Sequence, residues 1–84
     1  MLGRVVCSSA GRDKGKFMVV LGKEEGCLIV ADGKERPLER PKKKNPKHIK
    51  KTNSILESKQ YSTNKSLRKA LREFKGDCEL QEED

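Results

Sequence analysis

The sequence predicts a mainly β fold: a small barrel, followed by a C-terminal helix and an acidic tail that we expect to be disordered. Short β-rich apolar runs, separated by glycine-containing turns, fill the first part of the chain. The runs at 16–21 and 27–31 are apolar on both faces, whereas a sheet with one wet face would alternate. A curled sheet whose outer face is partly covered by the later part of the chain accounts for this pattern.

Three strands are expected first, over residues 2–8, 16–21 and 27–31. Residues 22–26 (GKEEG) predict a hairpin turn of three to five residues between the second and third strands. The Asp-Gly dipeptide at 32–33 predicts another tight turn, because its glycine is free to adopt a positive φ.

The next part of the chain is rich in proline and lysine. Residues 35–39 predict a short fourth strand at a sheet edge, because Pro37 cannot donate a hydrogen bond to a ladder. Residues 40–52 predict little regular structure, apart from a short fifth strand anchored by Ile49 that closes the barrel.

The C-terminal part predicts one amphipathic helix. Leu67, Leu71 and Phe74 recur at helical spacing, so they form one narrow apolar stripe. A serine or threonine at 62–63 can cap the start of the helix, and Gly76 can end it.

The chain is therefore expected to have four parts. Ile55 and Leu56 are the apolar anchors expected in an otherwise polar linker. The parts are a barrel with its basic closing segment at 1–52, the linker at 53–61, the helix at 62–76 and the acidic tail at 77–84.

The distribution of charge predicts a polyanionic partner. The net charge is +7 over 84 residues, but the tail at 77–84 holds five acids and no base. The other 76 residues therefore carry +12, which favours binding to nucleic acid. The tail could compete weakly for the same basic surface or could serve only solubility, and the sequence leaves both alternatives open.

Three cysteines without a Cys-x-x-Cys pair favour neither a disulfide framework nor a zinc site. Cys7 and Cys27 lie in apolar runs and are expected in the core, and Cys78 in the exposed tail.

No signal peptide and no apolar run of membrane-spanning length is visible. We expect a soluble, monomeric protein of the reducing cytoplasm that does not bind membranes.

The loop at 10–16 is the first candidate site. Gly11 and Gly15 would let its backbone approach a phosphate closely, and the cations Arg12, Lys14 and Lys16 flank them. An ordinary solvated loop is the alternative interpretation.

This region resembles the KOW motif, in which a strand, a loop with a fixed glycine and a Lys-Gly pair, and a second strand follow one another. Gly11 matches the fixed glycine and Lys14-Gly15 the Lys-Gly pair, while Met18 stands where many KOW sequences have glycine. Residues 28–33 and 37–49 resemble the fourteenth e-type large-subunit ribosomal protein and its small bacterial relatives. The resemblance, over about residues 1–57, implies an SH3-like barrel that binds ribosomal RNA, with loop cations on phosphates.

The second candidate site is a basic segment. Residues 34–51 hold nine lysines or arginines and two glutamates, a net charge of +7. A solvated basic loop is again the alternative. Together the two candidate sites predict these RNA-binding residues: Arg12, Lys14, Lys16, Arg36, Arg40, Lys42, Lys43, Lys44, Lys47, Lys50 and Lys51.

Catalysis and metal binding are not expected, and neither is a cofactor. The only histidine, His48, stands among lysines without an acid or cysteine at ligand spacing, and no nucleophile set or P-loop is present. The chain has only three aromatic residues, so base-specific recognition of RNA is not expected. We predict instead that the protein recognises the shape and backbone of RNA, on the ribosome or its precursors. A protein-interaction module of a transcription or translation complex and an unselective DNA and RNA binder are the alternatives.

Overall fold

The structure is a computed structural model that describes residues 2–9 and 14–73. Its strands are β1 (Arg4–Ser8), β2 (Phe17–Glu24), β3 (Cys27–Ala31), β4 (Lys42–Lys44) and β5 (Ile49–Ile55). Two 3₁₀ turns, η1 (Pro46–His48) and η2 (Ser58–Tyr61), precede and follow β5, and one helix, α1 (Asn64–Arg72), comes last. The predicted mainly β fold with a C-terminal helix is therefore confirmed.

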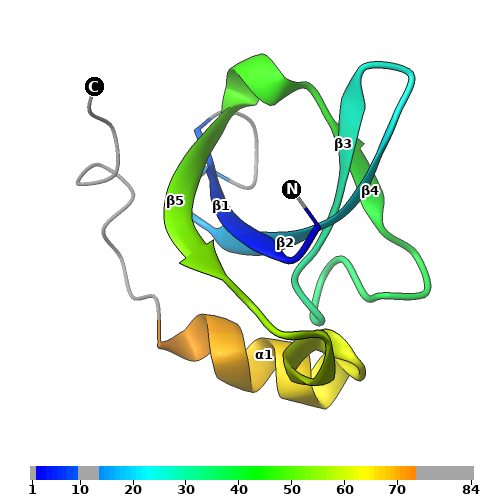
Figure 1. The fold of residues 1–84 in the computed structure, drawn as a ribbon. Coiled ribbons are helices and arrows are strands. Elements are labelled where there is room, and N and C mark those ends of the chain that lie inside the picture. The colour runs from blue at the N-terminus through cyan, green and yellow to red at the C-terminus, as the bar shows by residue number, and fades with distance from the viewer. Residues whose placement is uncertain (1, 10–13, 74–84) are drawn as a thin grey trace.

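The strands form one antiparallel sheet with the order β4-β3-β2-β1-β5. The sheet curves strongly, so that β5 and β4 rise on opposite sides of the central strands and η1 crosses between them (Figure 1). Only residues 45–48 separate the two edge strands along the chain. This short connection keeps one end of β4 close to the start of β5.

The first three strands lie close to their predicted positions, but the hairpin between β2 and β3 is tighter than expected. Glu24 pairs with Cys27, so the turn has two residues rather than three to five. Glu25 and Gly26 both have positive φ, 53° and 81°, which matches the right-handed twist of the flanking strands.

The fourth strand was predicted in the wrong place. Residues 35–39 form a turn in which the Asp32 carboxylate accepts hydrogen bonds from the amides of Lys34 and Arg36, at 2.8 and 2.9 Å. The strand is instead Lys42–Lys44, inside a segment for which we expected little regular structure. Prolines stand before and after these lysines but not among them, so the ladder to β3 keeps its donors.

The fifth strand is anchored at Ile49, as predicted, and is longer than expected. It continues to Ile55, three residues into the segment at 53–61 that we expected as a linker, and η2 follows it. Of the two expected anchors, Leu56 is buried, whereas Ile55 is 59% exposed.

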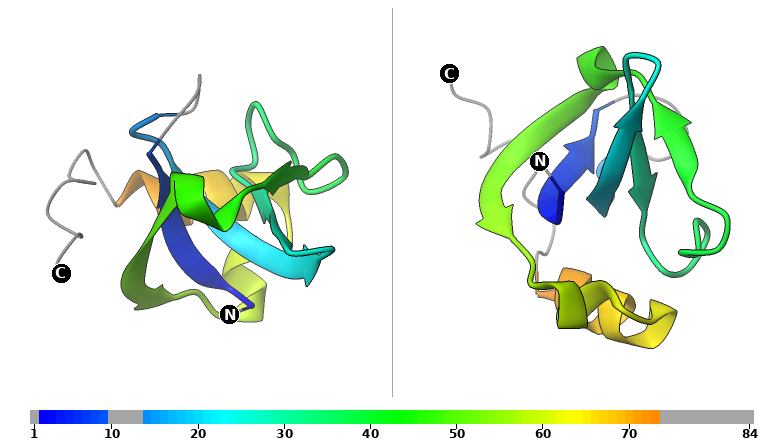
Figure 2. Two further views of the ribbon diagram at one scale, coloured as in Figure 1. Left: turned by 90° about the horizontal axis from the view of Figure 1, so that it is seen from above. Right: turned by 45° about the vertical axis from the view of Figure 1, so that its right-hand side comes forward.

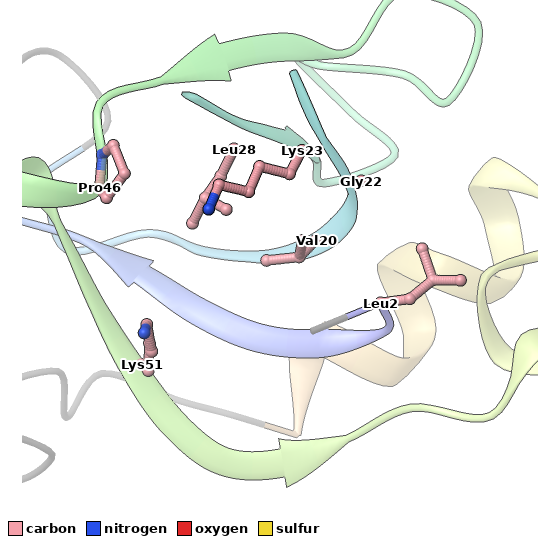
Figure 3. Close-up of a pocket in the computed structure, with 7 residues that line it drawn as sticks. All are labelled: Leu2, Val20, Gly22, Lys23, Leu28, Pro46 and Lys51. Carbon is pink, nitrogen blue, oxygen red and sulfur yellow. The ribbon is translucent and has the colours of Figure 1, made fainter. Parts of the chain in front are cut away.

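Apolar side chains pack on both faces of the sheet. An inner cluster fills the concave side, where Val20 and Leu28 point into the space that the curve encloses (Figure 3). An outer cluster lies between the other face and α1, which runs beneath the sheet (Figures 1 and 2). The inner cluster contains Val6, Met18, Val20, Leu28, Val30 and Ile49, and the outer cluster Val5, Val19, Ala31, Leu56, Leu67 and Leu71.

These clusters confirm the prediction that a later part of the chain covers the outer face. Phe17 and Tyr61 pack at the margin of the outer cluster. Cys7 is fully buried, as expected, but it is disulfide-bonded, which the spacing of the cysteines did not predict. Cys27 is a free cysteine and is only half-buried. Cys78 and the acidic tail lie outside the described residues.

The helix α1 begins at one of the two predicted caps. The Thr63 hydroxyl oxygen accepts a hydrogen bond from the amide of Ser66 at 3.1 Å. Leu67 and Leu71, from the predicted apolar stripe, are 0% and 8% exposed. Phe74 and Gly76, the other residues expected in or after the helix, lie outside the described residues.

Gly33 holds α1 against the loop that follows β3. Its φ is +80°, as the predicted turn requires, and the Arg68 guanidinium donates a 2.8 Å hydrogen bond to its carbonyl oxygen. A Cβ atom added to Gly33 would lie 2.7 Å from the carbonyl oxygen of Asn64. This glycine is therefore needed both for its backbone conformation and for the close approach of the helix.

We expect Gly33→Ala to lower the free energy of unfolding by about 2–4 kcal/mol, because it combines a left-handed conformation with a backbone clash. Urea unfolding followed by circular dichroism measures this loss. Gly22→Ala is the matched control: its Cβ would meet no atom within 4 Å, and the expected change is within about 1 kcal/mol. Equal effects of the two substitutions would contradict the role assigned to Gly33.

Candidate nucleic-acid interface

Ser9, the described residue that follows β1, lies against η1, which belongs to the basic segment. The amide of Ser9 donates a 2.8 Å hydrogen bond to the carbonyl oxygen of His48. In the adjoining strand pair, Ser8 faces Ile49 and Cys7 faces Lys50. Two basic stretches that are far apart along the chain therefore meet at one end of the sheet.

Gly15 shapes the described part of the loop between β1 and β2. Its φ is +88°, and its amide donates a 2.9 Å hydrogen bond to the carbonyl oxygen of Ser8. Lys14 and Lys16, on either side of it, are both exposed. The other predicted loop residues, Gly11 and Arg12, lie outside the described residues.

The lysines of the basic segment differ in exposure. Lys43, Lys47 and Lys51 are exposed, and Lys42 and Lys50 are half-buried. Lys44 is only 7% exposed, so little of its side chain can be reached from solution. For this reason we leave Lys44 out of the interface that we propose below.

Two predicted contact residues already have acidic partners. Lys16 Nζ lies 2.7 Å from Glu35 Oε1, and Lys43 Nζ lies 3.4 Å from Glu25 Oε1 and 3.6 Å from Glu24 Oε1. All these side chains are substantially exposed, and such surface pairs contribute only about 0–1 kcal/mol. A phosphate could therefore displace the glutamates at small cost.

Arg36 and Arg40 lie in the loop between β3 and β4, which is held by α1. Arg36 is half-buried and Arg40 is exposed. In this loop the amide of Leu38 donates a 2.7 Å hydrogen bond to Asn64 Oδ1. The Lys16–Glu35 pair connects the same loop to Lys16, at the described end of the first basic stretch.

Two lysines, Lys51 of the basic segment and Lys23 of β2, line a pocket on the concave side of the sheet. The pocket has a volume of about 310 Å³, and its walls include Leu2, Val20, Leu28 and Pro46 together with Lys23 and Lys51 (Figure 3). Lys51 was predicted as an RNA contact, but Lys23 was not. A bulge between Val20 and Gly22 shifts the strand register, so simple alternation along β2 places Lys23 on the wrong face.

Within residues 2–9 and 14–73, no group of three or more histidine, cysteine or acidic side chains could hold a metal ion. Among the same residues, no helix has the length and apolar character needed to cross a bilayer.

No family model matches the chain, and no curated protein matches it.

A hydrogen bond from the Asn64 side chain lowers the pKa of Glu39 below its ordinary value, and a backbone hydrogen bond acts in the same direction. Asn64 Nδ2 lies 2.9 and 3.2 Å from the two carboxylate oxygens. A lowered pKa means that folding favours the carboxylate. The stabilisation is therefore present at neutral pH and is lost as the pH falls through the folded-state pKa.

We expect Asn64→Ala to raise the pKa of Glu39 toward its ordinary value, because the first of these hydrogen bonds disappears. Titration of the Glu39 side-chain carboxyl carbon by NMR measures the change. Asn53→Ala, at an exposed position of β5, should leave the titration unaltered. An unchanged Glu39 pKa in Asn64→Ala would show that this bond does not control it.

Proposed function

We propose that this chain is an RNA-binding protein that contacts the phosphates of ribosomal RNA as part of the ribosome or of its precursors. One observation supports the proposal: the described ends of the connection between β1 and β2 lie beside the start of β5 and η1, in the basic segment that the sequence identifies separately. The Ser9–His48 hydrogen bond and the pairing of β1 with β5 hold them together. Cations that the fold brings to one end of the sheet can contact a phosphate backbone without reading its bases.

We further propose that the fold is an SH3-like barrel of the KOW type. Three features support this: β1 lies between β2 and β5, β3 lies between β2 and β4, and a short 3₁₀ turn connects β4 to β5. The strong curvature of the sheet and the apolar filling of its concave side also support this proposal (Figure 1). The resemblance of the first loop to the KOW motif points to the same fold.

The charges at this end of the sheet favour a polyanion over an acidic small molecule. Residues 40–51 contain seven lysines or arginines and no acid. In the part of the chain that the structure describes, Lys14, Lys47 and Lys51 have no carboxylate at ion-pair distance. These cations are spread over a loop, a 3₁₀ turn and a strand, as contacts to several successive phosphates require.

The second candidate function is binding to another protein of a transcription or translation complex. The observation that favours it is the exposure of two large apolar side chains, Leu2 at 61% and Ile55 at 59%. Binding through such residues would tolerate salt, whereas phosphate binding would weaken steeply with salt.

We expect Lys14→Glu, Lys47→Glu and Lys50→Glu together to weaken binding to a structured ribosomal RNA fragment by about tenfold or more. The plot of log affinity against log salt should also become shallower, by roughly 0.7–0.9 for each phosphate that the variant no longer neutralises. Fluorescence anisotropy at several salt concentrations measures both quantities.

The control for this experiment is a triple variant with the same change of charge elsewhere. Lys59, Lys65 and Lys69 are exposed in η2 and α1, away from the basic end of the sheet. Their replacement by glutamate should weaken binding much less and keep more of the salt dependence. If both triple variants lose the same affinity, only net charge matters and the proposed surface is wrong.

We expect the tagged protein to migrate with large-subunit or precursor particles on a gradient at low salt and to be released at moderate salt. Release by salt is expected because phosphate contacts are screened and compete with cations. Migration with particles that survives high salt would favour the protein-binding alternative. Absence from every particle would contradict the ribosomal assignment.

A further inference from the structure

The pocket on the concave side of the sheet combines an apolar interior with two cations. Its floor is formed by Val20 and Leu28 of the inner cluster, and Leu2 and Pro46 stand at its sides (Figure 3). Lys51, one of these cations, is also among the residues proposed above to contact phosphates. Leu2, which lines the pocket at its margin, is 61% exposed.

The strand register places both lysines on the concave face. Lys23 pairs with Leu28 and Lys51 pairs with Val6, and both partners belong to the inner cluster. Directly opposed residues of antiparallel strands point to the same face, so both ammonium groups border an otherwise apolar interior. Figure 3 shows the Lys23 amine beside Leu28 and Lys51 on the opposite side of the pocket.

We propose that this pocket receives one unstacked base of a single-stranded RNA segment, while Lys23 and Lys51 bind the phosphates on either side of that base. The inference rests on the proposed function and adds a second kind of contact to it. The volume of about 310 Å³ is at the low end of the roughly 300–1,000 Å³ of ligand pockets, which suits one planar ring rather than a peptide segment.

The position of the pocket favours RNA over an acidic protein as its occupant. Pro46 and Lys51 belong to the basic segment itself, and Pro46 is followed directly by the exposed Lys47. An RNA backbone that follows the basic segment therefore passes the mouth of the pocket. Unpaired bases turn outward at little cost in loops and bulges, and their faces can pack against apolar side chains such as Leu2 and Pro46, which are exposed.

The walls of the pocket also predict its selectivity. The described lining has aliphatic groups and two flexible ammonium groups but no rigid fork of donors aimed at a base edge. Contacts to the face of a base tolerate any sequence. The pocket should therefore distinguish RNA that has a base at this position from RNA that lacks one, with weak preference among the four bases.

The experiment compares a single-stranded RNA decamer with the same decamer carrying one abasic site at its centre. Methyl NMR spectra should show shifts of Leu2, Val20 and Leu28 with the intact decamer and much smaller shifts with the abasic one. The amides of Lys47 and Lys50 should shift with both, because they report phosphate binding.

The matched variants are Leu2→Ala and Ile55→Ala, which truncate the two exposed large apolar side chains of the part of the chain that the structure describes. Only Leu2 lines the pocket, and neither change affects a buried residue. We expect Leu2→Ala to weaken binding of the intact decamer about three- to tenfold, because less apolar surface is buried, and to leave the abasic decamer unchanged. Ile55→Ala should change neither.

Each outcome separates this inference from the proposed function. Shifts at Lys47 and Lys50 without shifts at the three methyl residues would overturn the base pocket and leave RNA binding in place. No shifts with either decamer, together with no binding of structured ribosomal RNA, would overturn both. Shifts of the three methyl residues with an acidic leucine-containing peptide but with neither RNA would assign the pocket to a protein partner and reject the proposal.

Discussion

The strands β1, β2 and β3 have apolar residues on both faces, and the rest of the structure is arranged to keep both faces dry. Val5 and Val6 are neighbours that point to opposite faces of the sheet, yet both are 0% exposed, and the same holds for Val19 and Val20. Curvature encloses one face, and α1 covers the other. A chain with 32% hydrophobic residues achieves this only by concentrating them in these strands and in the helix stripe.

The concentration of apolar residues in the central strands decides where the charged residues can lie. The central strands have few positions left for polar side chains, so lysines accumulate in β4, η1 and β5, at the margins of the sheet. The surface that we propose for RNA is therefore the part of the fold that the core does not use. Lys44 is the exception, because its place at the end of β4, opposite Leu28, buries it.

The sequence predicts most of the core and less of the interface, for identifiable reasons. The apolar runs, the Thr63 cap and the positive φ of Gly33 depend on neighbours along the chain, so local patterns are sufficient. The β4 ladder depends on an open edge of β3, which composition around Lys42–Lys44 does not reveal. Lys23 faces the pocket because of a bulge, and which of Ile55 and Leu56 is buried depends on how β5 ends.

The pairing of β1 with β5 has a consequence for synthesis of the protein. One of the two strands that pair with β1 is β5, at residues 49–55, which is synthesised only after most of the domain. During translation, at roughly 5–20 residues per second, a hairpin of β1 and β2 therefore waits for seconds with an unpaired edge and an apolar face. Such an edge is a template for pairing with other chains, so the nascent domain is most exposed to aggregation in this interval.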